Sequence, residues 1–215
     1  MKTVLLPVKG FRNAKQRLTG ILTSDQRESL ARAMLLDVLV AIVSSNSVEQ
    51  AIVITASDEV GRIASVHGLE VVGETRVDGH SAAVNHMARR LGDTASAFLA
   101  IASDLPALRG DEIDQVLDSG GDGIVLMSSR DRTGTNGVLL RPGATIEMEY
   151  GPHSLNRHVS LARSNGLVVD VLENPGFGFD VDTPGDLAHL IEAAPRNGET
   201  WRCVTALGVL DALTE

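Results

Sequence analysis

Two aspartates near the C-terminus, Asp180 and Asp182, have the spacing of a metal-binding pair. They lie in a short stretch that is expected to be extended, and residues two apart on an extended chain point to the same side. Two carboxylates held that close repel each other unless a cation lies between them, and ligation by oxygen alone suits Mg²⁺. The pair therefore predicts a divalent-metal site.

The residues after this pair have the pattern of a helix start. Thr183 fits the N-cap, Pro184 fits the first helical position, and Asp186 completes a capping-box-like pair. Acidic residues before a helix often only cap it and favour the positive end of its dipole. We expect this structural role for Asp186, whereas Asp180 and Asp182 are candidates for chemistry.

A cationic segment near the N-terminus supplies a second candidate. Residues 1–18 hold five basic and no acidic residues, although the whole chain has 19 Lys and Arg against 28 Asp and Glu. Lys9, Lys15 and Arg17 lie in a glycine-containing loop that suits a polyphosphate, although a solvated basic face would look the same. The loop matches neither the Walker A motif nor the dinucleotide-binding Gly-x-Gly-x-x-Gly pattern.

Short apolar runs alternate with amphipathic segments along the rest of the chain, which is typical of a mostly parallel α/β sheet covered on both faces. Strands are expected at residues 3–8, 51–55, 69–72, 97–102, 123–127, 137–140 and 167–172. Helices are expected from about residues 24, 58, 80 and 154, with further helices near the C-terminus. There is no internal repeat or long linker, so we expect residues 1–215 to form one domain.

Three candidate segments follow expected strands. The loop of residues 9–17 follows the first strand, Asp104 follows the buried strand at 97–102, and the Asp180–Asp182 pair follows the last strand. Ligands in open α/β sheets bind beyond the carboxyl ends of the strands, although a lone Asp there is often only a turn residue. A basic loop with three aspartates suits a nucleoside triphosphate with Mg²⁺, where catalysis is mainly positioning and charge neutralisation.

The composition argues against several classes of protein. The net charge of −9 argues against general nucleic-acid binding, and every apolar run is soon broken by charge, which argues against a membrane span. The single cysteine, Cys203, excludes an internal disulfide framework and fits a reducing compartment. The N-terminal apolar run is too short for a signal peptide. We expect a soluble, cytoplasmic protein, and the sequence is compatible with a homodimer without defining the assembly.

Five segments follow one another in an order that is specific, although no segment is specific alone. They are Pro7-x-Lys9-x₅-Lys15-x-Arg17-Leu18, Asp104-Leu-Pro106, Gly134-Thr135, Tyr150-Gly151-x-x-Ser154-x₃-His158 and Asp180-x-Asp182-Thr-Pro-x-Asp186-Leu. In this combination, from about residue 4 to residue 190, the chain resembles the CofC-like guanylyltransferases. These enzymes take part in the biosynthesis of the deazaflavin coenzyme of methanogens, actinobacteria and some other bacteria.

The resemblance implies a single-domain, Rossmann-like nucleotidyltransferase fold with a mixed, mostly parallel sheet and helices on both faces. It implies transfer of GMP from GTP to a phosphorylated three-carbon acid, with release of pyrophosphate. In the family that acid is 2-phospho-L-lactate, phosphoenolpyruvate or 3-phospho-D-glycerate. The implied roles are Mg²⁺ ligation by Asp104, Asp180 and Asp182, acid binding by Thr135, Gly151 and Ser154, and triphosphate binding and charge neutralisation by Lys9, Lys15 and Arg17.

The acid-binding residues also make chemical sense without the resemblance. Gly151 lets the backbone approach a ligand, and Ser154 begins an expected helix whose free N–H groups suit a carboxylate or phosphate. Ser154 also fits a plain N-cap, His158 a structural histidine, and Thr135-Asn136 a turn. One departure concerns the nucleotide: the chain has His80-Ser81 where the family usually has Leu-Asn, in a loop expected near the base or ribose.

Other interpretations remain open at this point. Sugar-phosphate and molybdopterin nucleotidyltransferases share the implied fold. A glycosyltransferase that holds a sugar nucleotide with Asp-x-Asp would release no pyrophosphate, and an inactive nucleotide-binding regulatory domain would show no turnover. A phosphoaspartyl phosphatase is excluded, because its Asp-x-Asp-x-Thr motif follows the first strand and needs a later lysine, whereas no lysine follows Thr183 here.

Overall fold

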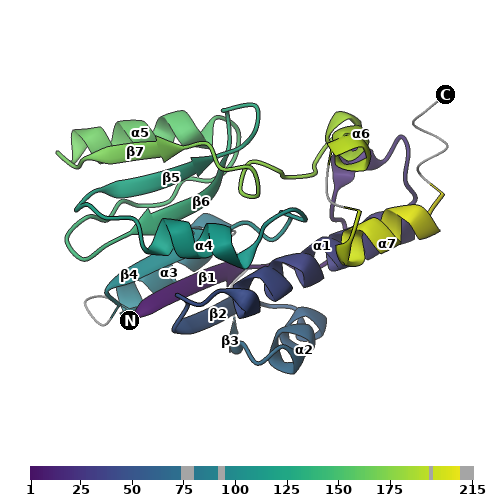
Figure 1. The fold of residues 1–215 in the computed structure, drawn as a ribbon, viewed down its shortest axis with the longest axis horizontal. Coiled ribbons are helices and arrows are strands. Elements are labelled where there is room, and N and C mark those ends of the chain that lie inside the picture. Colours follow the sequence, from purple (N-terminus) through teal and green to yellow (C-terminus); the bar gives the residue numbers. More distant parts are fainter. Residues whose placement is uncertain (74–79, 92–94, 194–195, 209–215) are drawn as a thin grey trace.

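A seven-stranded mixed sheet runs through the computed structural model, which describes residues 1–73, 80–91, 95–193 and 196–208 (Figure 1). The strands are β1 Lys2–Pro7, β2 Gln50–Thr55, β3 Glu70–Gly73, β4 Ala97–Ile101, β5 Ile124–Ser128, β6 Thr135–Leu140 and β7 Val169–Leu172. Their order is β3-β2-β1-β4-β6-β5-β7. Neighbouring strands are parallel except where β6 pairs with β4 and with β5. The expected mixed, mostly parallel α/β sheet is confirmed.

Helices separate most of the strands. They are α1 Ser24–Ser44, α2 Asp58–Val66, α3 His80–Leu91, α4 Gly110–Leu117, α5 Ser154–Ser164, α6 Pro184–Ala193 and α7 Gly198–Ala206, with a 3₁₀ turn η1 at Gln16–Leu18. Helix α4, which is only two turns long, was not predicted from the sequence. No helix in the described part of the chain is long and apolar enough to cross a membrane.

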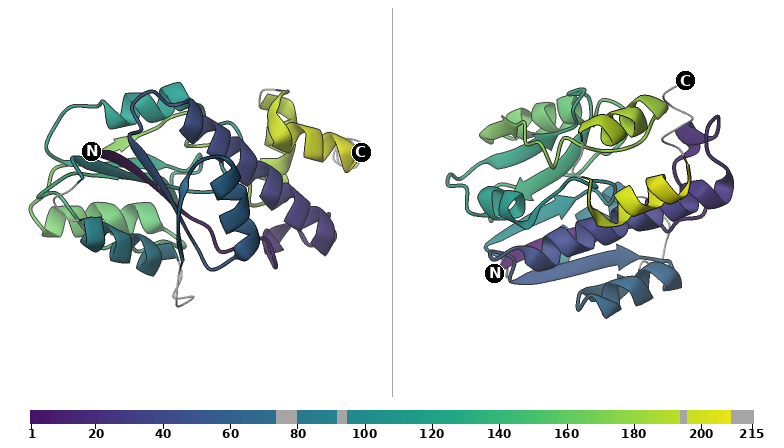
Figure 2. Two further views of the ribbon diagram at one scale, coloured as in Figure 1. Left: turned by 90° about the horizontal axis from the view of Figure 1, so that it is seen from below. Right: turned by 45° about the vertical axis from the view of Figure 1, so that its right-hand side comes forward.

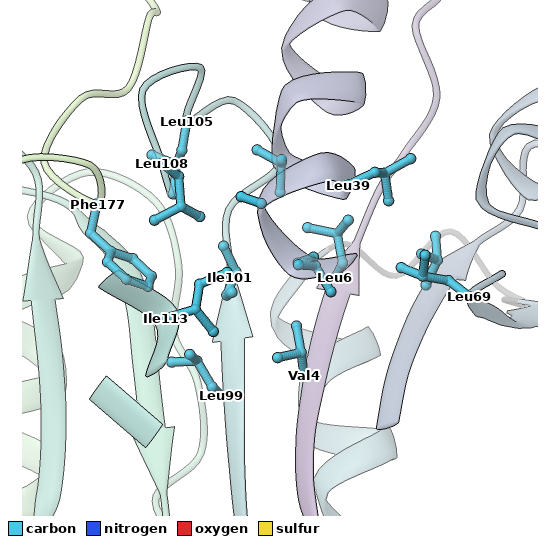
Figure 3. Packing of buried hydrophobic residues seen from close by; sticks show 14 of the residues in the cluster. Val4, Leu6, Leu39, Leu69, Leu99, Ile101, Leu105, Leu108, Ile113 and Phe177 are labelled. Carbon is cyan, nitrogen blue, oxygen red and sulfur yellow. The ribbon is translucent and has the colours of Figure 1, made fainter. Parts of the chain in front are cut away.

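The two faces of the sheet carry separate hydrophobic clusters. On one face, side chains of β1 and β4 such as Leu6 and Ile101 pack against Leu39 of α1 and Ile113 of α4, with Phe177 closing the end (Figure 3). On the other face, side chains of α3 and α5 pack against the strands. Covering both faces explains why β1, β4 and β5 are almost continuously apolar.

A third, smaller cluster lies beyond the sheet. It joins the end of the N-terminal basic loop, the start of α1, the segment before α6, α6 itself, and α7. Its buried members are Leu18, Leu22, Leu30, Met34, Val181, Leu187, Leu190 and Val204. Helix α7 packs along α1 at this end of the molecule (Figure 2). Val181 and Leu18 are fully buried in this cluster, which thereby ties two distant segments of the chain together.

Most local expectations agree with the structure. The stripe Leu30, Met34, Val38 and Ile42 is buried, and α1 begins behind a capping box formed by Thr23 and Gln26. The expected loop over residues 133–136 is wrong at its end, because Thr135 and Asn136 already belong to β6. Thr135 pairs with Ser128 across an irregularity in the β5–β6 ladder. Backbone pairing between the strands therefore overrides the turn preference of Thr135-Asn136.

Burial of Val181 predicts a stability effect. Truncating this fully buried side chain, Val181→Ala, should lower the free energy of unfolding by about 2 kcal/mol, from lost methyl groups plus a cavity. The matched control is Val66→Ala, at a valine that is 85% exposed. That control should change the free energy by about 0.5 kcal/mol or less. Chemical denaturation of both variants measures the difference, and equal effects would contradict the packing described for the third cluster.

Candidate active site

A cleft of about 540 Å³ opens at one edge of the sheet and collects most of the predicted site residues. Its lining comes from Arg17, residues 102–104, 129–131, 133–136 and 150–154, and Asp180, Asp182, Thr183 and Asp186. A larger hollow of about 840 Å³ lies beside α2 and contains none of the predicted site residues. The smaller cleft is therefore the candidate active site, because most of the predicted site residues line it.

The direction of β6 explains why these segments meet. Strands β1 and β4 run parallel, so the basic loop and Asp104 follow their carboxyl ends at one edge. Strand β6 runs antiparallel to β4, so its first residues reach the same edge. The link is direct, since Ala102 N donates a hydrogen bond to Asn136 O at 2.8 Å. Thr135 and Asn136 thus enter the cleft beside Asp104.

Lys15 joins two of the three aspartates. Its Nζ lies 2.5 Å from Asp104 Oδ2 and 2.7 Å from Asp182 Oδ1, and only 8% of its side chain is exposed. Burial by itself would lower the pKa of Lys15, but the attraction and hydrogen bonds of the two carboxylates outweigh burial and raise it. Lys15 is therefore a charged ammonium that partly neutralises the carboxylates.

Asp180 has a different environment from its neighbour. Burial raises the pKa of Asp180 to about 6, with repulsion from Asp104 and Asp182 adding to the shift. The opposing interaction is a hydrogen bond from Asn136 Nδ2, 2.9 Å from Asp180 Oδ1. The same amide donates to Phe177 O at 2.8 Å, so Asn136 fixes the loop that carries Asp180. Asn136 was not predicted as a site residue from the sequence, because Thr135-Asn136 resembles a turn.

Asp186 has the structural role expected of it. Its carboxylate accepts hydrogen bonds from Thr183 N at 2.9 Å and Asp182 N at 3.2 Å, while Asp186 N donates to Thr183 Oγ1 at 3.2 Å. Burial would raise the pKa of Asp186, but a hydrogen bond from the Thr183 hydroxyl at 2.7 Å, the two backbone N–H groups and the Arg130 guanidinium together lower it. The capping box at the start of α6 thereby also orients the backbone of Asp182.

The basic loop is tightly wound around Lys15. Gly10, Asn13 and Lys15 have positive φ angles of 102°, 60° and 52°, which turn the chain back on itself before η1. Arg27 on α1 is 6% exposed and donates to Ala14 O at 3.3 Å and Leu22 O at 2.9 Å. This buried arginine, which the sequence did not reveal, fixes the loop from behind.

The three predicted basic residues have different positions. Lys15 is buried against the carboxylates, and Arg17 lines the cleft with an exposed side chain. Lys9 is exposed at the end of β1 and is not part of the cleft lining. The structure thus brings Lys15 and Arg17 together with the aspartates, while the role predicted for Lys9 stays a prediction.

Hydroxyl and backbone groups form the other wall of the cleft. Thr135 N donates to Ser154 Oγ at 3.0 Å, and the two hydroxyl oxygens lie 3.4 Å apart. Ser154 is the first residue of α5, and His153 before it, with a φ of 57°, is the N-cap, so the Ser154 hydroxyl serves Thr135 rather than its own helix. Gly151, with a φ of 123°, lines the same wall. The three predicted acid-binding residues therefore lie together.

His158 lies directly behind this wall. It is fully buried on α5, with Nδ1 3.1 Å from Thr135 Oγ1 and Nε2 accepting from Glu149 N at 2.9 Å. Burial lowers the pKa of His158 to about 4, with the nearby Arg157 charge adding to the shift. The imidazole is therefore neutral near pH 7. The sequence indicated a structural role for His158 but did not reveal its contact with Thr135.

The departure at His80-Ser81 lies at the start of α3, next to Asp78 and Gly79, which are outside the described residues. Ser81 is described, and its Oγ accepts a hydrogen bond from Tyr150 N at 2.9 Å. Asn85, one turn later on α3, bonds both backbone groups of Met148. The start of α3 therefore supports the chain leading into the acid-binding wall, a role not anticipated from the sequence.

The three aspartates fit a divalent cation by chemistry but are not a preformed site. Across the described ranges, no three His, Cys, Asp or Glu side chains are arranged to hold a metal as they stand. The Lys15 ammonium bridges Asp104 and Asp182 instead. The donors are all carboxylate oxygens, which suit Mg²⁺, and a cation would relieve the repulsion that contributes to the raised pKa of Asp180.

Comparison with known proteins places this chain in a family. The fold resembles that of a nucleotidyl transferase from Methanothermobacter thermautotrophicus, with a TM-score of 0.64 at 15% identity over 88% of this chain and 95% of that one. The family model described as guanylyl transferase CofC like matches residues 1–197. The chain belongs to this family of CofC-like guanylyl transferases.

Named relatives differ in the acid that their names contain. A phosphoenolpyruvate guanylyltransferase of Conexibacter woesei is 36% identical, over 90% of this chain and 89% of that protein. A 3-phospho-D-glycerate guanylyltransferase of Phenylobacterium zucineum is 31% identical, over 86% and 88%. A 2-phospho-L-lactate guanylyltransferase of Methanothermobacter thermautotrophicus is 30% identical, over 89% and 85%. These similarities favour guanylyl transfer over the sugar-phosphate, molybdopterin and glycosyltransferase alternatives.

The buried neutral histidine predicts a pH-dependent stability. In the unfolded chain His158 takes up a proton near pH 6.5, but in the folded protein only near pH 4. Stability should therefore be unaffected by this group above about pH 6.5 and fall as the pH drops toward 4, by about 2–4 kcal/mol. Urea unfolding of wild type and His158→Asn at pH 7 and pH 4.5 measures this. The variant should lose less stability on acidification, and an equal loss would contradict the assignment.

Proposed function

We propose that this protein transfers GMP from GTP to the phosphate of a phosphorylated three-carbon acid and releases pyrophosphate. The observation that carries the proposal is the pairing of two walls in one cleft. One wall holds Asp104, Asp180 and Asp182 with the Lys15 ammonium, and the other holds the hydroxyl and backbone donors around Thr135 and Ser154. The first wall suits a metal-bound triphosphate, and the second suits the oxygens of a small acid.

Phosphoenolpyruvate, 2-phospho-L-lactate and 3-phospho-D-glycerate are the candidate acids. All three carry a carboxylate and a phosphate monoester, and each occurs in the name of one of the relatives described above. In the proposed pathway the reaction is a step of deazaflavin coenzyme biosynthesis in the cytoplasm. The family match supports guanylyl transfer, and the acid is to be identified by assay.

The proposed reaction needs no protein base. A phosphate monoester is largely dianionic near neutral pH, since its second pKa is about 6. One of its oxygens attacks the α-phosphorus of GTP in line with the departing pyrophosphate, forming the new P–O bond as the old one breaks. Thr135, Gly151 and Ser154 would hold the acid in position, while Lys9, Lys15 and Arg17 would offset the charge that develops on the phosphates.

We also propose that Asp104, Asp180 and Asp182 hold Mg²⁺. When bound, the cation would supply charge neutralisation at the phosphates. The chain's own contribution is to keep the three carboxylates at one edge of the cleft through the Asn136 amide, the capping box at Thr183 and the burial of Val181. Lys15 would move from the carboxylates toward the triphosphate, exchanging one anion for another.

The direct test of the proposal is pyrophosphate release. Purified protein with GTP and Mg²⁺ should release pyrophosphate with at least one of the three acids, and mass analysis should find an adduct of GMP and that acid. ATP, CTP and UTP in place of GTP test the base preference. Absence of pyrophosphate with every acid and nucleotide would overturn the proposal and favour an inactive nucleotide-binding domain.

Removal of one metal-site carboxylate should abolish most of the activity. We expect Asp104→Ala to lower kcat by about 100-fold or more, because the charge that would hold the cation is lost while the core is untouched. The matched control is Asp118→Ala, which removes the carboxylate partner of Lys2 at the other end of β1. The control should keep its rate, and a near-normal rate in Asp104→Ala would exclude the metal role.

Lys15 should compete with a free cation for the carboxylates. In the absence of nucleotide, we expect Lys15→Met to bind Mn²⁺ more tightly than wild type, because the ammonium no longer neutralises Asp104 and Asp182. The same variant should turn over more slowly with GTP. Electron paramagnetic resonance of Mn²⁺ gives the affinity, and Lys2→Met is the control. Weaker or unchanged Mn²⁺ binding in Lys15→Met would contradict the bridging role.

A further inference from the structure

His158 is a fully buried side chain that contacts one of the proposed acid-binding residues. It lies on α5 one turn after Ser154, and both of its ring nitrogens have partners. Nε2 lies 2.9 Å from Glu149 N, and Nδ1 lies 3.1 Å from Thr135 Oγ1. The ring is not part of the cleft lining, so any influence on a ligand passes through a neighbour: Thr135, or Tyr150, which lines the cleft and whose ring meets the imidazole edge-on with centroids 5.4 Å apart.

The partners define which nitrogen carries the proton. A backbone N–H can only donate, so Nε2 must accept the hydrogen bond from Glu149 and carries no proton. A neutral imidazole then has its single proton on Nδ1. The Nδ1–H group therefore donates to Thr135 Oγ1, and this assignment follows from the partners rather than from an observed hydrogen.

This hydrogen bond decides what the Thr135 hydroxyl can do. A hydroxyl has one proton to donate and two lone pairs, and one lone pair of Oγ1 is taken by His158. Among the described residues, Ser154 Oγ lies 3.4 Å away and donates to Oγ1 over a distance that is long for an O–H···O hydrogen bond, so the Thr135 proton is not directed at this oxygen. An anionic oxygen in the cleft at ordinary distance would be a better acceptor for this proton.

We propose that His158 is a positioning residue that orients the Thr135 hydroxyl as a hydrogen-bond donor to an anionic oxygen of the acid substrate. The inference rests on the proposed function, since it takes Thr135 as part of the acid site. It adds a residue that never touches the substrate. The imidazole occupies the accepting side of Oγ1, so the proton of Thr135 is directed at the ligand.

A purely structural histidine would behave differently. Losing such a residue would lower the stability of the fold and would weaken the binding of the acid and of GTP to a similar extent. A positioning residue that acts through Thr135 affects the acid alone, because Lys15, Arg17 and the aspartates occupy the other wall of the cleft. The distinguishing quantity is therefore the KM for the acid against the KM for GTP.

The first experiment compares two substitutions of His158 in the full-length protein. His158→Leu fills the space without a donor, whereas His158→Asn places an amide N–H near the position of Nδ1. We expect His158→Leu to raise the KM for the acid about tenfold, equal to the loss of one hydrogen bond, and to change the KM for GTP less than about twofold. His158→Asn should recover most of the loss. Equal effects of the two variants, or equal effects on the two substrates, would overturn the proposal.

The second experiment is a double-mutant cycle with Thr135→Val, which removes the hydroxyl and keeps the branched shape. If His158 acts through Thr135, His158→Leu should have no further effect on the KM for the acid in the Thr135→Val background. Independent, additive effects in the double variant would show that His158 acts by another route and would overturn the proposal.

A third measurement needs no substitution, so it tests the proposal even if His158→Leu fails to fold. In wild-type protein labelled with ¹⁵N-histidine, NMR should show His158 protonated on Nδ1, and adding an acid without GTP should shift this resonance. Protonation on Nε2, or no shift at saturating acid, would overturn the proposal. If the wild type releases no pyrophosphate with any acid, the proposed function fails and this inference fails with it. If the wild type is active but the acid KM of His158→Leu is normal, this inference alone fails.

Discussion

Burial of Val181 is the constraint on which the site depends. This side chain lies between Asp180 and Asp182 and is fully buried in the cluster that also holds Leu18 of the basic loop. Because alternate residues of extended chain face opposite ways, burying the valine turns both carboxylates toward the cleft. The same apolar contact holds the basic loop in place, so that Lys15 reaches Asp104 and Asp182. This small cluster thereby holds Asp180, Asp182 and Lys15 close together, and the Lys15 ammonium offsets part of the repulsion between the carboxylates.

The reversal of β6 complements this constraint. An all-parallel sheet would bring only carboxyl ends of strands to the cleft, whereas β6 brings its first residues there. Neighbouring residues of a strand face opposite sides, so Thr135 contacts Ser154 and His158 while Asn136 contacts Asp180. One dipeptide thus connects the wall that suits an acid to the wall that suits a metal and a triphosphate. Backbone pairing of β6 with β4 and β5 positions this dipeptide, and its side-chain hydrogen bonds join it to both walls.

The sequence allowed local features of the fold and the chemistry of the site to be predicted, but not its long-range contacts. Periodicity predicted α1, and the order Thr183-Pro184-x-Asp186 predicted the start of α6, because caps and stripes depend on neighbours in the chain. The antiparallel direction of β6 and the roles of Asn136 and His158 depend on partners dozens of residues away, or on a backbone N–H. Arg27 contacts backbone carbonyls 5 and 13 residues away, outside its own helix. Such partners leave no periodic signal, so Asn136 was interpreted as a turn residue and His158 as structural. The motifs that resemble the family were informative because they assigned residues that are far apart in the sequence to one common site.

The central claim is that an acid phosphate attacks the α-phosphorus of GTP in this cleft. Radiolabelled GTP tests it most directly, with the label placed at the α-phosphorus in one reaction and at the γ-phosphorus in another. We expect the α label to appear in the acid adduct and the γ label to appear in pyrophosphate. A γ label on the acid, or an α label found only in free GMP, would contradict it.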